Sequence, residues 1–237
     1  MIYEKDNLVA TAYCGDAASS YDRERFETEQ GVSFDSLEWG ELQKAVGKIS
    51  QGASILEVGC GTARFSRRLA ESGYRVRAID ASADMIKVSS EKCRGLKNIT
   101  FAQEEAADLS SDNCSFDLVF SIRVTNQIGS KGYAFRMIRE MIRVAERGGL
   151  ILVEFANSKR PLKKKNKSTR LSFAEISKLA RELNCCVESR RGILILSQTI
   201  LNKMPRSLIP MWLTLEKLLA VFLWRWASRG YAVIRKL

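Results

Sequence analysis

Short apolar runs alternate with amphipathic segments along the middle of the chain. Residues 54–58 (SILEV) form an apolar run that ends in a glycine-rich turn, which is typical of a buried strand. Residues 62–72 follow with apolar side chains at helical spacing, and Gly73 ends that segment. The same pattern predicts further strands at 75–79, 98–102, 116–121, 150–155, 184–197 and 230–236. It predicts further helices at 82–93, 132–146 and 172–183, the second ended by Gly148 and Gly149.

This order predicts an α/β protein. Strands that alternate with helices of ten or more residues form βαβ units, which build a mostly parallel sheet with helices on both faces. The first fifty residues do not follow the pattern, so we expect 1–50 to form a helical N-terminal cover over a ligand. Residues 51–237 are expected to form one domain, with 201–229 as a helical insertion that acts as a lid over a substrate.

The turn after the first predicted strand contains the strongest chemical signal. It reads Gly59-Cys60-Gly61-Thr62-Ala63 and leads into a predicted helix. Glycine lets a ligand approach the backbone closely, and the first amides of a helix bind negative groups. Ligands of open α/β sheets bind at the carboxyl ends of the strands, where this turn lies. No Lys-Ser or Lys-Thr follows, which excludes a phosphate-binding P-loop.

A carboxylate follows the second predicted strand. Asp80 lies where an acidic side chain can accept hydrogen bonds from both hydroxyls of an adenosine ribose. The alternative is a capping role before the next helix, for which Ser82 is the other candidate. The glycine turn and Asp80 together favour a nucleotide-like ligand.

The residues around this turn resemble motif I of the class I methyltransferases that use S-adenosylmethionine (SAM). The common motif has an acidic residue, a small apolar residue and then GCGTG; Glu57 matches the acidic position, and Ala63 replaces the third glycine. The segment AIDASADMI around Asp80 resembles the second motif of the family. The resemblance implies a Rossmann-like seven-stranded sheet with an antiparallel last strand. It also implies that SAM, with S-adenosylhomocysteine as product and no metal, is bound by Glu57, Gly59, Cys60, Gly61, Asp80, Ala81 and Met85.

Further matches extend the resemblance over residues 50–157. Glu105 and Ala106 match the family positions that bind adenine, and Ser121 matches the end of the fourth strand, beside the methyl group. The segment RVAERGG at 143–149 is similar to the RVLKPGG of small-molecule methyltransferases of the menaquinone-biosynthesis type. A fainter match in the N-terminal cover, at Tyr21-Asp22 and Arg25, implies that Tyr21 contacts the methionine part of SAM and that Arg25 also binds the cofactor.

The resemblance implies methyl transfer to a small-molecule or lipid-linked acceptor, at oxygen, carbon or nitrogen. Because the sulfonium of SAM is already activated, positioning supplies much of the rate acceleration. The chain has no histidine, and a general base cannot be named. Arg123, Asn126 and Tyr21 are the candidates for contact with the reacting groups. The Pro-Pro-aromatic signature of nucleic-acid amino methyltransferases is absent from the loop after the fourth strand.

Charge leaves two other hypotheses open. The 237 residues contain 38 Lys and Arg against 27 Asp and Glu, a formal net charge of +11. Such an excess attracts nucleic acid, anionic lipid or phosphorylated molecules, or simply forms a solvated basic surface. An RNA methyltransferase is therefore the alternative, and a non-catalytic SAM-binding protein is a third hypothesis. Six cysteines without a CxxC pair argue against zinc and, with no apolar leader at the start, indicate a cytoplasmic protein.

Two late segments suggest peripheral contact with a membrane. Residues 208–226 (LIPMWLTLEKLLAVFLWRW) are strongly apolar, but Pro210 and the pair Glu216-Lys217 argue against a membrane-spanning helix. The segment fits an apolar cover over a hydrophobic acceptor, an interfacial helix, or a core helix packed on the sheet. The basic segment 159–167 fits a loop that meets lipid headgroups, phosphates or RNA, or a solvated loop.

Overall fold

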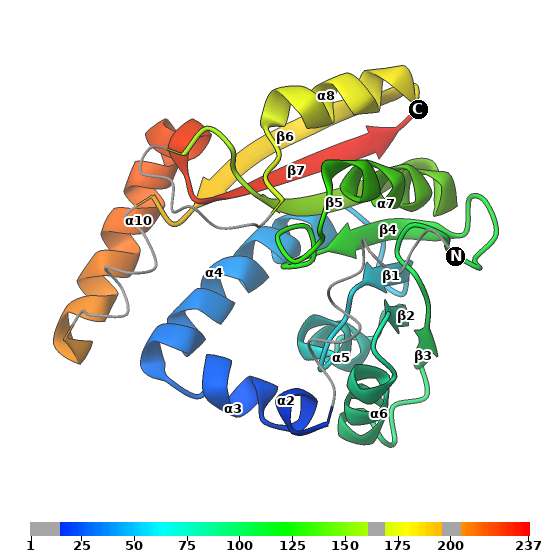
Figure 1. Cartoon of the computed structure of the whole chain (residues 1–237), viewed down its shortest axis with the longest axis horizontal. Coiled ribbons are helices and arrows are strands. Elements are labelled where there is room, and N and C mark those ends of the chain that lie inside the picture. Colours follow the sequence, from blue (N-terminus) through cyan, green and yellow to red (C-terminus); the bar gives the residue numbers. More distant parts are fainter. Residues whose placement is uncertain (1–14, 161–168, 196–204) are drawn as a thin grey trace.

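The computed structural model describes residues 15–160, 169–195 and 205–237 (Figure 1). Its centre is a seven-stranded sheet with the strand order β3-β2-β1-β4-β5-β7-β6. The strands are β1 Ser54–Val58, β2 Arg75–Asp80, β3 Ile99–Gln103, β4 Phe116–Ser121, β5 Ala145–Ala156, β6 Cys185–Ile193 and β7 Arg229–Lys236.

Helices cover both faces of this sheet. In chain order the α-helices are α2 Asp16–Ser19, α3 Tyr21–Phe26, α4 Glu29–Val46, α5 Arg64–Glu71, α6 Ala83–Lys92, α7 Lys131–Val144, α8 Phe173–Glu182 and α10 Ile209–Leu223. Two 3-10 helices, η1 Arg206–Leu208 and η2 Trp224–Trp226, flank the last of them.

The strand directions confirm the predicted fold class. Strands β1 to β5 pair in parallel with one another, whereas β7 runs antiparallel to both β5 and β6. A parallel connection needs a crossover, and α5, α6 and α7 provide helices between successive parallel strands. The fold is therefore a Rossmann-like sheet with helices on both sides and an antiparallel last strand.

Alternate residues of the central strands face two separate hydrophobic cores. Ile55 and Leu118 belong to the core shared with α4, α5 and α10, and Leu56 and Val119 belong to the core shared with α7 and α8. Side chains on a strand alternate between the two faces, so a central strand that is buried on both sides is apolar throughout. This explains why β1 and β4 could be located from their continuous apolar runs.

The boundary between α7 and β5 differs from the prediction. The helix ends at Val144 instead of continuing to residue 146, and β5 begins at Ala145, five residues earlier than predicted. Gly148 has φ +76°, and the pairing between β4 and β5 shifts register between Phe116 and Leu118. The two glycines therefore lie in an irregular first part of the strand rather than ending the helix.

Helices α2, α3 and α4 form the described part of the N-terminal region, beside α5 and α6 in Figure 1. Thr28 caps α4, because its hydroxyl accepts a hydrogen bond from the Gly31 amide at 3.0 Å. Residues 1–14 of the predicted cover lie outside the described residues.

Near the C-terminus, β6 ends at Ile193, and residues 196 and 197 of the predicted strand lie outside the described residues, as do 161–167 of the basic segment. Helix α10 lies at one edge of the molecule in Figure 1. Within the described ranges, no helix has the length and apolar content needed to cross a membrane.

Candidate functional site

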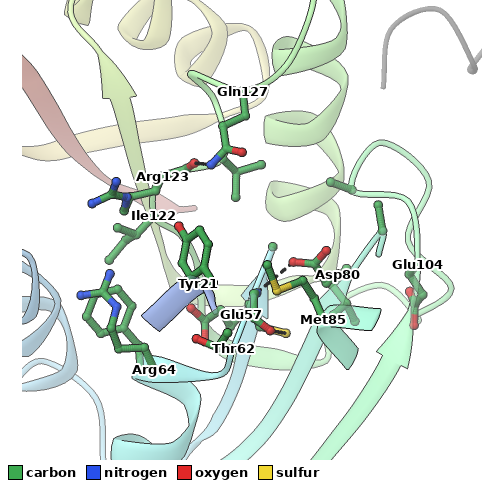
Figure 2. Close-up of a pocket in the computed structure, with 18 of the residues that line it drawn as sticks. Tyr21, Glu57, Thr62, Arg64, Asp80, Met85, Glu104, Ile122, Arg123 and Gln127 are labelled. Atoms are coloured by element: carbon green, nitrogen blue, oxygen red, sulfur yellow. Dashed lines mark hydrogen bonds between the residues drawn. The ribbon is translucent and has the colours of Figure 1, made fainter. Parts of the chain in front are cut away.

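A pocket that is partly open to solvent lies at the carboxyl ends of β1, β2 and β4 (Figure 2). Helix α3 contributes Tyr21 and Phe26 to one wall, so part of the N-terminal region lines the site. The other lining residues are Glu57, Gly59, Cys60, Gly61, Thr62, Arg64, Phe65, Ile79, Asp80, Ala81, Met85, Glu104, Ala106, Ile122, Arg123, Val124, Gln127, Ile128 and Tyr133.

The glycine turn has a backbone that only small residues tolerate. The amides of Gly59 and Cys60 donate hydrogen bonds to the Ile79 carbonyl at 2.8 and 2.9 Å, which joins the turn to β2. Gly59 has φ +78°, and a Cβ atom there would lie 2.2 Å from a methyl group of Val124. Gly61 has φ +54°, and a Cβ atom there would meet no protein atom within 4 Å. The absent side chain at Gly61 thus leaves space for a ligand against the backbone.

Asp80 lies at the end of β2 with both carboxylate oxygens held by the backbone. Its Oδ2 accepts from the Gly61 amide and its Oδ1 from the Ser82 amide, each at 2.9 Å. Burial raises the pKa of this carboxyl group, although these hydrogen bonds partly oppose the shift. Each oxygen has a second lone pair, so the side chain can still accept hydrogen bonds from a ligand. Its position fits recognition of the hydroxyls of a ribose.

Glu57 lies at the base of the pocket and is almost completely buried. Its Oε2 accepts from the Ser66 amide at 3.0 Å and from the Ser66 hydroxyl. Burial raises the pKa of Glu57 to about 8, against the lowering effect of these bonds and of Arg64. The carboxyl group is therefore largely protonated at neutral pH, and a cationic ligand group beside it would favour the charged form.

Glu105, Ser121 and Arg25 are outside the lining of this pocket, whereas the other predicted cofactor-contacting residues line it. The Glu105 carboxylate accepts from the Tyr133 hydroxyl at 2.6 Å, and Tyr133 and the neighbouring Ala106 do line the pocket. The Ser121 hydroxyl donates to the Val58 carbonyl at 2.9 Å, which joins β4 to β1. Arg25 lines a second cavity on the other side of Arg123.

Arg123 lies between these two cavities and lines both. It has φ +68°, which is unusual for a residue with a side chain, and its amide donates to Glu154 at 2.7 Å. Its guanidinium lies 5.0 Å from the ring centre of Phe34 and 5.6 Å from that of Phe26. These contacts fix a cation beside an apolar surface. In Figure 2, Arg123 and Gln127 lie together on one side of Tyr21, away from Asp80 and Met85.

The other two candidates for the reaction lie differently. Tyr21 lines the pocket at the centre of Figure 2. Asn126 is not among the lining residues, and its buried Oδ1 finds no hydrogen-bond donor in the described part of the chain. The structure therefore places Arg123 and Tyr21 in the lining of the same pocket, whereas Asn126 is not part of that lining.

A buried network of charges supports the Arg123 side of the pocket. Glu38 of α4, which has no exposed surface, accepts from Arg64 at 2.6 Å, and its other oxygen lies 3.7 Å from Arg123. Burial raises the pKa of Glu38, while Arg123 and Arg64 lower it. Glu154 of β5, equally buried, binds the Arg123 amide and the Arg229 guanidinium, the latter at 2.9 Å. Removing Arg229 would leave the buried Glu154 without its cation, whereas Glu38 has two cations, Arg64 and Arg123.

The N-terminal region is joined to the glycine turn by polar contacts. Asp22 of α3 accepts from the Thr62 hydroxyl at 2.6 Å and forms an ion pair with Lys92 of α6. The Gly15 amide donates to Asp84 of α6 at 2.8 Å. These bonds fix α3, and with it Tyr21, over the pocket.

Several lining residues were not predicted as site residues, most clearly Phe26, Arg64, Gln127 and Tyr133. Arg64 directly follows the glycine turn, and Gln127 shares the loop with Arg123, so their positions in the chain were a usable signal. Phe26 and Tyr133 gave no such signal, because they come from helices that reach the pocket only in the folded chain. Across residues 15–160, 169–195 and 205–237, no three His, Cys, Asp or Glu side chains lie together as metal ligands.

Residues 55–149 match the family described as "Methyltransferase domain". The demethylmenaquinone methyltransferase of Clavibacter sepedonicus is 32% identical over 154 residues, which are 64% of this chain and 60% of that protein. The 2-methyl-6-phytyl-1,4-hydroquinone methyltransferase of Synechocystis is 31% identical over 49% of this chain and 35% of its own length. The chain thus spans less than two thirds of the length of these relatives.

Solved structures show the same fold at low sequence identity. The magnesium protoporphyrin IX methyltransferase of Synechocystis, with bound SAM, superposes with a TM-score of 0.69 at 15% identity, over 97% of this chain and 96% of that chain. A [4+2]-cyclase, SpnF, superposes with a TM-score of 0.68 at 16% identity, over 98% and 96%. The domain match supports the resemblance to methyltransferases, and the superpositions show that the fold is shared, while the cyclase shows that this fold occurs with another activity.

Proposed function

We propose that this chain, which carries a class I methyltransferase domain, transfers the methyl group of SAM to a small-molecule acceptor. The observation that carries the proposal is the pairing of an open glycine turn with Asp80 at the carboxyl ends of β1 and β2. Gly61 gives the ligand access to the backbone, Gly59 lets Val124 pack against the turn, and Asp80 is placed to accept from a ribose. When bound, SAM supplies a methyl group on a positively charged sulfur, which an acceptor atom displaces.

The remaining cofactor contacts follow from the lining of the pocket. Cys60, Ala81, Met85 and Ala106 surround the Asp80 side, where the adenine would lie. Glu57 and Tyr21 are proposed to contact the methionine part, the former because a buried carboxyl favours a cationic partner. Glu105 and Ser121 do not line the pocket and would act indirectly. Glu105 would hold the lining residue Tyr133 in place, and Ser121 would hold β4 against β1. Arg25 would act from the second cavity.

We place the acceptor on the other side of Tyr21, beside Arg123. Phe26, Phe65 and Ile122 provide apolar walls there, and Arg123 and Gln127 provide polar groups. Such a site suits an acceptor with an apolar ring and an acidic group, such as a phenol or carboxylate. The relatives named for demethylmenaquinone and for 2-methyl-6-phytyl-1,4-hydroquinone support an acceptor of this kind, including a lipid-linked one. Arg123 and Tyr21 would orient it, with the rate coming mainly from positioning and the exclusion of water.

The predicted lid at 201–229 remains a proposal. None of residues 205–229, which the structure describes, lines the pocket, and α10 packs instead on β6 and α4. A lid function would therefore require another arrangement of this helix. Peripheral membrane contact through the same segment is a separate proposal. Residues 161–167 of the predicted basic segment lie outside the described part of the chain.

Two measurements test the proposed function. Calorimetry should show micromolar binding of S-adenosylhomocysteine, and no binding to the folded protein would overturn the proposal. SAM with a deuterated methyl group should then label small molecules in a cell extract, detected by mass spectrometry, with heat-treated protein as control. Label in an organic-solvent fraction supports a lipid-linked acceptor. Label in RNA, with binding that falls steeply as salt rises, would favour the RNA alternative that the net charge of +11 leaves open.

A further inference from the structure

Helix α10 presents an apolar surface to solvent. Met211, Leu215, Leu218, Val221 and Phe222, which we name the outer face, are 61, 44, 60, 66 and 80% exposed. Residues spaced by three or four lie on the same side of a helix, so the five side chains form one continuous strip. The strip extends about 16 Å along the helix axis. Contiguous apolar patches of this kind on a protein surface mark a site of interaction.

The orientation of α10 is fixed by its opposite side. Ile209 and Trp212 are buried in the core shared with α4. Glu216 is 1% exposed, and its carboxylate accepts from the Ile195 amide at 2.7 Å. The acidic residue of this helix therefore lies inside while five of its apolar residues lie outside, unlike an ordinary surface helix. Rotating the outer face inward would break the Glu216 hydrogen bond and expose Trp212.

The charges around the outer face are basic. Glu216 is the single acidic residue in the sequence from 205 to 229, and it is buried. Lys217 and Arg225 of the same segment are exposed. Strand β6, which α10 contacts, adds the exposed Arg191, whereas the neighbouring Arg190 points to Ser177 of α8 on the other face of the sheet.

One acidic residue of α4 faces the groove between α4 and α10. Glu41 is largely buried and is paired with Lys44 and Arg191. An apolar strip flanked by cations is complementary to an anionic lipid surface.

We propose that this protein binds peripherally to anionic lipid membranes through the outer face of α10. The five apolar side chains enter the boundary between headgroups and acyl chains, and Lys217, Arg225 and Arg191 contact lipid phosphates. In this arrangement α10 lies along the membrane, in keeping with the absence of a membrane-crossing helix among the described residues. A second copy of the chain fits less well, because pairing two outer faces would bring Lys217 and Arg225 of each copy together.

Vesicle sedimentation tests the proposal without requiring a known acceptor. The wild-type protein should pellet with vesicles of phosphatidylcholine and phosphatidylglycerol and only weakly with phosphatidylcholine alone. Val221→Asp places a charge in the outer face and should lower the bound fraction about tenfold. Val32→Asp is the matched control, because Val32 is also exposed, at 57%, but lies on α4. It should bind vesicles as the wild type does, and both variants should bind S-adenosylhomocysteine equally well.

A second measurement reports where the protein meets the lipid. Trp226 is 52% exposed beside the outer face, so lipids brominated in the acyl chains should quench its fluorescence, and Trp226→Phe should remove that component. Equal vesicle binding by Val221→Asp and Val32→Asp would overturn the proposal, as would a wild type that never pellets. So would a lipid-free dimer that Val221→Asp dissociates, because the outer face would then be occupied by a second copy.

Discussion

The two sides of the pocket are built in different ways. On the Asp80 side, the shape comes from backbone geometry within a short stretch of chain, with amide hydrogen bonds that join the glycine turn to β2. On the Arg123 side, the shape comes from charged side chains of α4, α5, β5 and β7, which meet only in the folded molecule. A cofactor that is the same whatever the acceptor can be bound by backbone groups and a single carboxylate. An acceptor that differs among related proteins requires side chains that can be replaced without rebuilding the turn.

The sharpest test of this difference is removal of the Asp80 carboxylate. Asp80→Ala should weaken binding of S-adenosylhomocysteine roughly 100-fold, because it removes charged hydrogen bonds to the ligand and the support of the Gly61 amide. Calorimetry measures the effect. Asp84→Ala is the matched control, since Asp84 also accepts from a backbone amide, that of Gly15, but does not line the pocket. A folded Asp80→Ala protein with wild-type affinity would show that the cofactor lies elsewhere.

The buried carboxyl of Glu57 predicts a pH dependence on the same side of the pocket. With an ordinary pKa of 4.5 when unfolded and about 8 when folded, Glu57 binds a proton on folding, so its contribution to stability falls as pH rises through this window. Glu57→Gln removes that loss. Without cofactor, the variant should gain about 2 kcal/mol over the wild type between pH 5 and pH 6.5, and more as the pH rises to 8.

Denaturation in urea at a series of pH values measures this gain. Glu71→Gln, at an exposed carboxylate paired with Arg67, is the control and should follow the wild type. If the pH profiles of Glu57→Gln and the wild type run parallel, Glu57 does not hold a proton in the folded protein.

The smallest expected effect concerns the other side of the pocket. Arg123→Ala should lower the free energy of unfolding by about 1 kcal/mol, because Glu38 loses one of two cations while Arg64 remains. Affinity for S-adenosylhomocysteine should stay within about threefold of the wild type, since Arg123 is placed on the acceptor side. Methyl labelling of the acceptor should fall, and Arg123→Lys should restore part of it. A large loss of cofactor affinity would remove the distinction between the two sides.

Outside the pocket, helices α7 and α10 show how far apolar periodicity alone can be trusted. The α7 segment has apolar residues at helical spacing and buries Ile138, Met141 and Ile142 as predicted. The α10 segment is apolar on nearly all sides, so its pattern could not distinguish a core helix from an interfacial one. The structure shows that Trp212 is buried and Phe222 is exposed, because Glu216 finds its hydrogen-bond donor in the interior.

The sequence by itself determined the alternating strands and helices, the glycine turn, and the carboxylates at the ends of β1 and β2. These features are local, since a buried strand needs a continuous apolar run and a close backbone approach needs glycine at one position. Only the tertiary structure decided that Glu38, Arg64, Arg123, Glu154 and Arg229 form one network, that Tyr133 binds Glu105, and which side of α10 faces solvent. Such arrangements depend on contacts between residues far apart in the chain, where a polar side chain takes whichever partner the packing of helices and strands brings within hydrogen-bonding distance.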